Sequence, residues 1–261
     1  MANLQRRDFL AGSLAAAAVS QASANGQPAQ GSDQELIELR AYRHSDAAKQ
    51  SSTLLFAATS LLPALKRQGI ERIGIFESTD ESDASIYLVI PYSSPEQLTQ
   101  QNDLLEADRA YHETSGEHFA HPMKDPAYTR IESRLMRGFK GMPKVIAPTQ
   151  KSPDRLVELR IYEAHNAHLA RRKVEMFNEG EIEVMQEVGL APVFFGETLI
   201  SDDVPNLSYM LSADSADAHK EHWQTFLAHP EWNRMKNLKR YANTVSKIQS
   251  ITMRPAPASQ L

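Results

Sequence analysis

The sequence predicts an α+β fold made of two tandem units, each with the element order β-α-β-β-α-β. Two observations carry this prediction. The segment ELRAY at 38–42 returns as ELRIY at 158–162, and the same offset of 120 positions aligns Gly69 with Gly189. In the second copy, residues 155–162 alternate between apolar and polar side chains, as a strand does. A strand and a glycine that recur at one fixed offset indicate a duplicated unit.

The first 24 residues have the layout of an export signal. A twin arginine, Arg6-Arg7, precedes an alanine-rich segment and the small-residue triplet 22–24. This segment resembles the leaders of the twin-arginine route, so we predict a signal peptide over 1–24, cleaved before Asn25. The resemblance implies a periplasmic or secreted protein that crosses the membrane folded. Whether a cofactor is loaded before export stays open.

Proline marks the division of the remaining chain. The segment GMPKVIAPTQKSPD contains three prolines and lies between the two copies, as linkers commonly do. We therefore predict the following division: a first unit at 33–140, a linker at 141–153, a second unit at 154–253 and a tail at 254–261.

In the second unit, the strand at 155–162 is followed by apolar residues at helical spacing. This helix is predicted to end at Gly189, with Leu190 as the apolar residue that follows a C-terminal glycine. The polar turn 201–203 separates the next two strands. The later elements are predicted as strands at 191–200 and 206–212, a helix at 214–240 with a break at Pro230, and a strand at 244–253.

The first unit repeats this order. Its first helix is predicted to end at Gly69-Ile70, and Pro63 is expected to kink it. The strands that follow are RIGIFES at 72–78 and ASIYLVI at 84–90, and the last strand lies near 128–138. The β-α-β-β-α-β order predicts a ferredoxin-like unit, with an antiparallel sheet and both helices on one face.

The other face of each sheet then needs a cover, and the second copy supplies it, so we expect the two sheets to pack face to face. We assign the apolar row Val157, Leu159 and Ile161 to the helix side. The opposite row then points between the sheets, in both copies: Glu38, Arg40, Tyr42, Glu158, Arg160 and Tyr162.

Charged side chains in such an interior must pair or line a wet cavity, because an unpaired buried charge costs several kcal/mol. One interpretation is an ion-pair lattice that fixes how the sheets meet. The other is a ligand chamber, in which Arg160 binds an anionic or carbonyl oxygen while Glu158 or Tyr162 exchanges a proton. A third alternative is that the two faces of the strand are reversed.

Three further residues are candidate ligand contacts: His165, just after the strand, and Phe195 and Glu197 in the segment FFGET. Core packing is the alternative for Phe195. Histidine pairs spaced i, i+3 occur at 118/121, 165/168 and 219/222, but each lacks a third ligand, so no metal site is predicted. Trp223 and Trp232 are expected to pack helix against sheet.

Composition excludes several classes of protein. With 261 residues, 41% of them hydrophobic, the chain can bury a substantial core. It contains no cysteine, which excludes disulfides and thiolate sites. The net charge of −5 argues against nucleic acid as a partner. No apolar run reaches membrane-spanning length, so after cleavage the protein is not expected to be an integral membrane protein.

Four segments of the second unit resemble the NIPSNAP family: ELRIYE at 158–163, APVFFGETL at 191–199, PNLSYML at 205–211 and WQTFLAHPEW at 223–232. In the first unit, DPAYTRIESRLMRGF at 125–139 is the best match. The first unit departs from the second by having Arg43 where the second has Glu163, and Ile75-Phe76 in place of Phe-Phe-Gly.

The whole chain resembles exported two-domain bacterial members of that family. The resemblance implies a dimeric α/β barrel of ferredoxin-like units, here formed within one chain. It implies little chemistry, although related barrels include haem-handling proteins and small monooxygenases.

The sequence therefore predicts that a small, partly apolar molecule binds in the chamber between the sheets. If the protein is an enzyme, we expect cofactor-light oxidation or proton-transfer chemistry, with Arg160 stabilising negative charge and Glu158 or Tyr162 moving the proton. The alternative is a non-enzymatic adaptor that binds another protein. The cofactor, the reaction and any homo-oligomer are left open.

Overall fold

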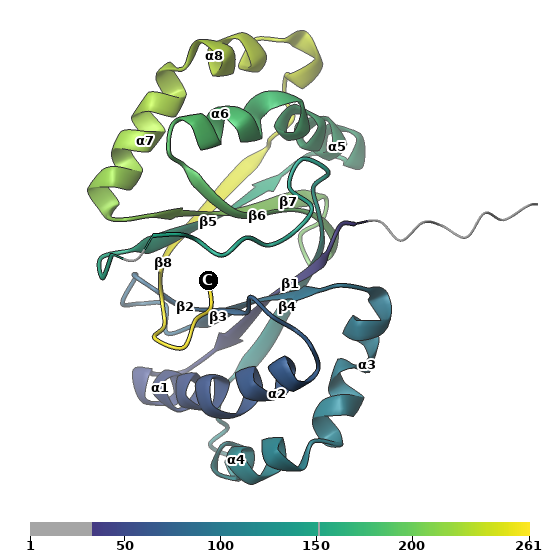
Figure 1. Cartoon of the computed structure of the whole chain (residues 1–261), viewed down its shortest axis with the longest axis vertical. Helices are drawn as coiled ribbons and strands as arrows, with labels where there is room; N and C mark the ends of the chain where they lie inside the picture. Colours follow the sequence, from purple (N-terminus) through teal and green to yellow (C-terminus); the bar gives the residue numbers. More distant parts are fainter. Residues whose placement is uncertain (1–32, 151) are drawn as a thin grey trace, which may run out of the picture. The chain divides into compact units, whose positions relative to one another are not determined.

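Eight antiparallel strands close into a barrel in the computed structural model, which describes residues 33–150 and 152–261 (Figure 1). The predicted signal peptide lies outside the described residues. The strands are β1 (Leu36–Arg43), β2 (Gly74–Ser78), β3 (Ile86–Tyr92), β4 (Arg130–Gly138), β5 (Leu156–Glu163), β6 (Ala191–Ile200), β7 (Asn206–Ala213) and β8 (Lys247–Pro255).

The order of the strands confirms the predicted fold class. β1 lies between β3 and β4, and β5 lies between β7 and β8, so each half has a ferredoxin-like sheet. Two further ladders join the halves: β2 pairs with β8, and β4 pairs with β6. These ladders close the sheets into one barrel and leave no unpaired edge strand. The chain therefore has the α+β fold of a dimeric α/β barrel.

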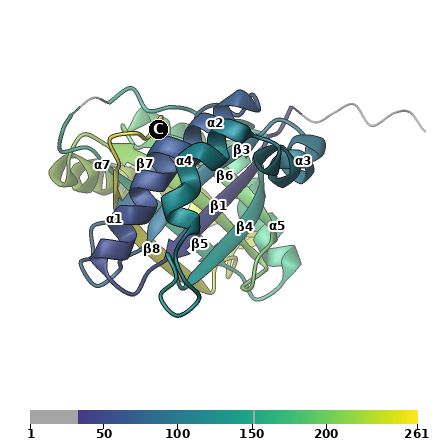
Figure 2. The same ribbon diagram turned by 90° about the horizontal axis from the view of Figure 1, so that it is seen from below.

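The helices cover the outside of the barrel, and Figure 2 shows those of the first half lying over its strands. The first half contains α1 (Ala47–Phe56), α2 (Leu62–Arg67), α3 (Pro95–Glu106) and α4 (Arg109–Phe119). The second half contains α5 (Ala167–Met176), α6 (Ile182–Glu187), α7 (Ala216–Ala228) and α8 (Pro230–Lys236). No helix in these described parts is long and apolar enough to cross a membrane.

Corresponding helices of the two halves share the same local design. Asp46 caps α1 and Asn166 caps α5, each by accepting a backbone N–H three residues later. A π-helical turn follows α1 at Ala57–Leu61 and follows α5 at Phe177–Glu181. Gly189 ends the second of these helical segments with a φ of +86°, as predicted from the sequence.

The apolar rows of β1 and β5 point into the barrel, which reverses our prediction for the two faces of these strands. Ile37, Leu39, Val157 and Leu159 belong to one buried cluster that fills the interior. Because successive side chains of a strand alternate between its faces, the row of Glu158, Arg160 and Tyr162 and its counterpart in β1 lie on the outer, helix-covered side. The interior of an eight-stranded barrel is narrow and is filled by side chains, which favours the apolar row there.

One end of the barrel is covered by the segments that were predicted as linker and tail. The side chains of Val145 and Leu261 are buried in the interior cluster. Glu35 accepts a hydrogen bond from the Val145 backbone N–H at 2.9 Å, and Gln260 accepts one from the Ile73 backbone N–H at 2.9 Å. These contacts leave the opposite end, where β1 and β5 finish, as the entrance to the interior.

Gly138, at the end of β4, provides a test of this packing. A Cβ at this position would lie 2.4 Å from the backbone carbonyl oxygen of Pro143, on the linker. We therefore expect Gly138→Ala to lower the free energy of unfolding by about 1–3 kcal/mol, measured by urea denaturation.

The matched control is Gly116→Ala in α4, where a Cβ would meet no atom within 4 Å. This change should raise stability by about 0.5–1 kcal/mol, as alanine does in an exposed helix. Equal effects of the two substitutions would contradict the close approach of linker and strand.

Candidate functional site

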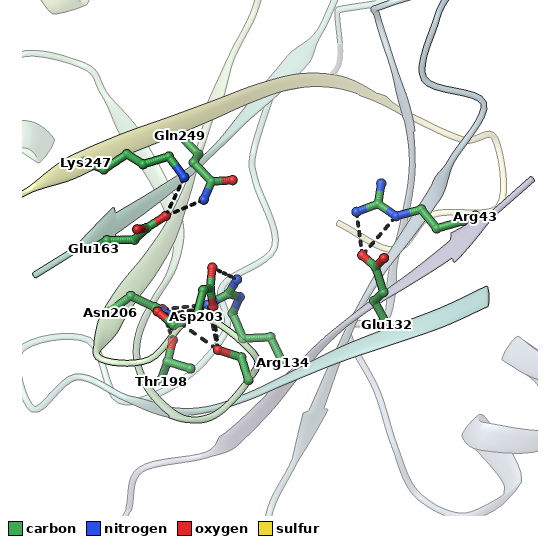
Figure 3. Close-up of polar contacts among 10 residues, drawn as sticks. Arg43, Glu132, Arg134, Glu163, Thr198, Asp203, Asn206, Lys247 and Gln249 are labelled. Atoms are coloured by element: carbon green, nitrogen blue, oxygen red, sulfur yellow. Dashed lines mark hydrogen bonds and ion pairs between the residues drawn. The ribbon is translucent and has the colours of Figure 1, made fainter.

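A cavity of about 520 Å³ lies between the two halves, at the end of the barrel where β1 and β5 finish; we call it the inter-sheet chamber. Its floor is apolar and comes from both halves: Leu39, Ala41, Leu159, Ile161 and Ile251. Its rim is polar and is drawn in part in Figure 3: Arg43, Tyr87, Glu132, Arg134, Asp203 and Gln249.

The same inward-facing rows supply both floor and rim. On β1 the row runs from Leu39 through Ala41 to Arg43, so it changes from apolar to charged as the strand reaches the entrance. On β4 the inward row contains Glu132 and Arg134. The charged groups lie at the rim, where they remain hydrated or paired, as charged groups in a protein must.

Arg43 is the centre of one polar cluster on the rim. Its Nη1 donates to Tyr87 Oη at 2.8 Å and to Ser85 Oγ at 2.9 Å, and its Nε and Nη2 donate to Glu132 Oε2 at 3.0 and 2.7 Å. The Tyr87 hydroxyl donates in turn to Asp83 at 2.8 Å. Burial and this hydrogen bond raise the pKa of Tyr87 to about 12, so the phenol keeps its proton at neutral pH.

Arg134 forms a second cluster, across the seam between the halves. It donates to Asp203 at 2.8 Å, to Asn206 at 2.7 Å and to Ser201 at 3.2 Å. Thr198 donates to the same Asn206 oxygen at 2.6 Å. Burial acts to raise the pKa of Asp203, but the hydrogen bonds from Arg134 and Ser201 outweigh it and hold the pKa below its usual range.

A third cluster surrounds Glu163, at the end of β5. Its carboxylate accepts hydrogen bonds from Lys247 at 2.9 Å and Gln249 at 2.7 Å, which lower its pKa. Glu163 occupies the position in the second unit that Arg43 occupies in the first. Because β1 and β5 are four strands apart in the barrel, this difference between the repeats places opposite charges on opposite sides of the entrance.

The catalytic candidates of the second unit lie outside the chamber, on the sheet face that α7 covers. Glu158 accepts a hydrogen bond from Arg160 Nη1 at 2.8 Å, from Trp223 Nε1 at 3.0 Å and from Ser250 Oγ, and His219 Nε2 lies 2.8 Å from it. Burial acts to raise the pKa of Glu158, but His219, Arg160 and Ser250 together lower it to about 2. Glu158 is thus an ionised, fully partnered group.

The neighbours of this carboxylate are paired as well. The guanidinium of Arg160 lies 4.7 Å from the ring centroid of Trp223, and the hydroxyl of Tyr162 accepts a hydrogen bond from Tyr209 at 2.9 Å. The structure therefore brings Glu158, Arg160 and Tyr162 together, as the sequence predicts, but places them between sheet and helix. This arrangement favours the ion-pair interpretation of the polar row.

The corresponding residues of the first unit lie on the opposite side of the barrel, so the two sets do not meet. Glu38 accepts hydrogen bonds from Arg40 Nε and Nη2, from Tyr92 and from Ser133, all at 2.8 Å. Tyr42 is buried. Glu38 and Arg40 border a separate cavity of about 220 Å³ beneath α3.

The remaining predicted contacts do not line the chamber either. His165 is exposed in the turn after β5. Phe195 is fully buried on the helix side and stacks against Phe139, with ring centroids 5.8 Å apart. Glu197 pairs with Arg137 at 2.7 Å on the outer surface. Among the residues that the structure describes, no group of three side chains is arranged to hold a metal ion.

Sequence reasoning missed the chamber residues because it chose the wrong face of the strands. One signal was available in β4, where RIESR places Arg130, Glu132 and Arg134 on a single face. Three charges on one face of a strand indicate contact with water, so that face had to lie near an opening. The contrast between Arg43 and Glu163 was the second signal.

The buried carboxylate makes a prediction about pH. Because the folded state lowers the pKa of Glu158 from 4.5 to about 2, its ionised form stabilises the fold above pH 4.5, and this stabilisation is lost as the pH falls toward 2. Glu158→Gln should therefore cost about 3 kcal/mol at pH 7, and the cost should shrink across that window. Urea titrations of both proteins at several pH values test this, and a cost that is independent of pH would contradict it.

Comparison with known proteins supports the fold and the family resemblance. Residues 157–260 match the family model described as NIPSNAP. No curated protein matches the chain.

Two solved structures cover most of the chain, and both are described as candidate monooxygenases. The one from Lactobacillus acidophilus is 11% identical, with a TM-score of 0.58 over 85% of this chain and 94% of that one. The one from Fusobacterium nucleatum is 7% identical, with a TM-score of 0.58 over 86% and 93%. Such likeness shows the fold alone. The comparisons thus support the NIPSNAP family through residues 157–260 and show the dimeric α/β-barrel fold for the chain.

Proposed function

We propose that the protein binds a small, partly apolar molecule in the inter-sheet chamber. The observation that carries this proposal is the cavity of about 520 Å³, with its apolar floor and polar rim. A volume of this size is typical of small-molecule sites, and the apolar floor offers a place for the apolar part of a ligand. The two solved structures of this fold are described as candidate monooxygenases, which is in keeping with a small-molecule ligand.

The chamber also orients its ligand. Leu39, Leu159 and Ile251 offer only apolar contacts, so the apolar part of a ligand is expected to enter first. Its polar part then stays at the rim, where Arg43 and Gln249 carry hydrogen-bond donors. Covering of the other end by linker and tail prevents passage through the barrel.

Any chemistry in the chamber would use groups other than those predicted from the sequence. The groups first considered, Arg160 and Glu158, are occupied by contacts between sheet and helix. Proton transfer or oxidation in the chamber would instead use the rim, where Tyr87 is a protonated phenol and Glu132 is a partly exposed carboxylate. The proposal also places the protein outside the cytoplasm, which rests on Arg6-Arg7 and the triplet 22–24.

Filling the chamber provides the test. Ala41 is buried and lines the chamber, so Ala41→Phe should occupy the space that a ligand needs. Protein purified from its host should show a bound small molecule by native mass spectrometry, and Ala41→Phe should lose at least 90% of it.

The matched control is Ala110→Phe, at an exposed position in α4, which should retain the ligand. Circular dichroism checks that both variants fold, and Ala41→Val offers a milder change if the larger ring does not fit. A wild-type protein that carries no small molecule, but copurifies with a partner protein, would favour the adaptor function.

A further inference from the structure

Three arginines line the chamber: Arg43, Arg130 and Arg134. Arg43 and Arg134 differ in how they are held. Arg134 donates to three side chains, Asp203, Asn206 and Ser201, and its side chain is only 13% exposed. All three partners belong to the second half, so Arg134 holds the two halves together. Arg43 is 34% exposed, and its main ionic partner is the exposed carboxylate of Glu132.

Arg43 does not depend on Glu132 for its position. Its Nη1 is fixed from behind by Ser85 and Tyr87, and Tyr87 is itself held by Asp83. The edge formed by Nε and Nη2 faces Glu132. If Glu132 moved away, this edge would stay in place with two parallel donors available.

Glu132 is held only loosely. Both donors of Arg43 meet a single oxygen, Oε2, and among the described residues Oε1 has no hydrogen-bond partner. The side chain is 45% exposed, so it can turn into solvent without losing other contacts. An exposed ion pair of this kind contributes little to stability, so its replacement by a ligand group costs little.

We infer that the ligand of the chamber is a monocarboxylate with an apolar body, whose carboxylate displaces Glu132 from Arg43. This inference rests on the proposed function. Glu132 itself shows that the Nε–Nη2 edge accepts a carboxylate, and an arginine edge binds such a group through two hydrogen bonds. Behind it, Leu39, Ala41 and Leu159 receive the apolar body.

The charges around the rim explain why a single negative charge suits this site. Arg134 pairs with Asp203 and Lys247 pairs with Glu163, and Arg130 also lines the chamber, so the rim carries charges of both signs. Asp83 lies 3.7 Å from Arg43 Nη1, so a second negative charge beside this arginine, as in a phosphate monoester dianion, would be repelled. A cationic ligand would face the guanidinium of Arg43. Both alternatives are outcomes of the test below.

Isothermal titration calorimetry with octanoate, octanol, octyl phosphate and octylamine tests the inference on the full chain. Octanoate should bind the wild type at least tenfold more tightly than the other three. Glu132→Gln removes the competing charge and should tighten octanoate binding by about two- to fivefold. Arg43→Gln should abolish it, and Arg43→Lys, which keeps the charge but lacks the two-donor edge, should weaken it.

Glu197→Gln is the matched control. It removes the partner of Arg137, in a comparable ion pair outside the barrel, and should leave octanoate binding unchanged. Tighter binding of octylamine or octyl phosphate, or octanoate binding that survives Arg43→Gln, would overturn the inference.

The outcomes separate this inference from the proposed function. Failure of octanoate to bind either the wild type or Glu132→Gln overturns the monocarboxylate class. If a native ligand that is sensitive to Ala41→Phe is nevertheless retained, the chamber remains the binding site. If no ligand is retained either, the proposed function fails as well.

Discussion

The closure of the barrel by two ladders between the halves is the constraint on which the rest of the structure depends. Pairing of β2 with β8 and of β4 with β6 removes every free edge from the two sheets. Closure also gives the barrel a single interior, which only the apolar rows of the strands can fill without unpaired charge. The floor of the chamber is the part of this interior that side chains leave open near the entrance.

The repeated Glu-Arg pair follows from the same constraint. With the apolar rows inside, Glu38-Arg40 and Glu158-Arg160 must lie under the helices, where each carboxylate collects several donors. Removing one member of such a buried pair leaves the other charge without a partner, so each pair constrains how helix and sheet meet. The second unit covers its pair with Trp223 from α7, whereas the first leaves a small cavity beneath α3. The two repeats therefore share the Glu-Arg pair but differ in the side chains that cover it.

The sequence was sufficient for the fold but not for the site. The 120-residue offset, the alternation of 155–162 and the glycine at 189 predicted the element order, and the structure confirms it. The face of each strand could not be read in the same way, because β1 and β5 are covered on both sides, by the interior and by helices. Their polar rows carry large, well-partnered groups that resemble a binding site. Only the rim residues, such as Glu132 on β4, indicate which face of the strands meets water.

The most direct test of this account is which side chains the apolar row of β5 touches. In protein with labelled methyl groups, nuclear Overhauser effects report contacts between methyls. The structure predicts such effects between Leu159 or Val157 and methyls of the first half, including Leu39 and Val89, because all four lie in one interior cluster. Effects that instead connect Leu159 and Val157 only to helix methyls such as those of Ile182 and Val184 would contradict the inward-facing row, and with it the chamber.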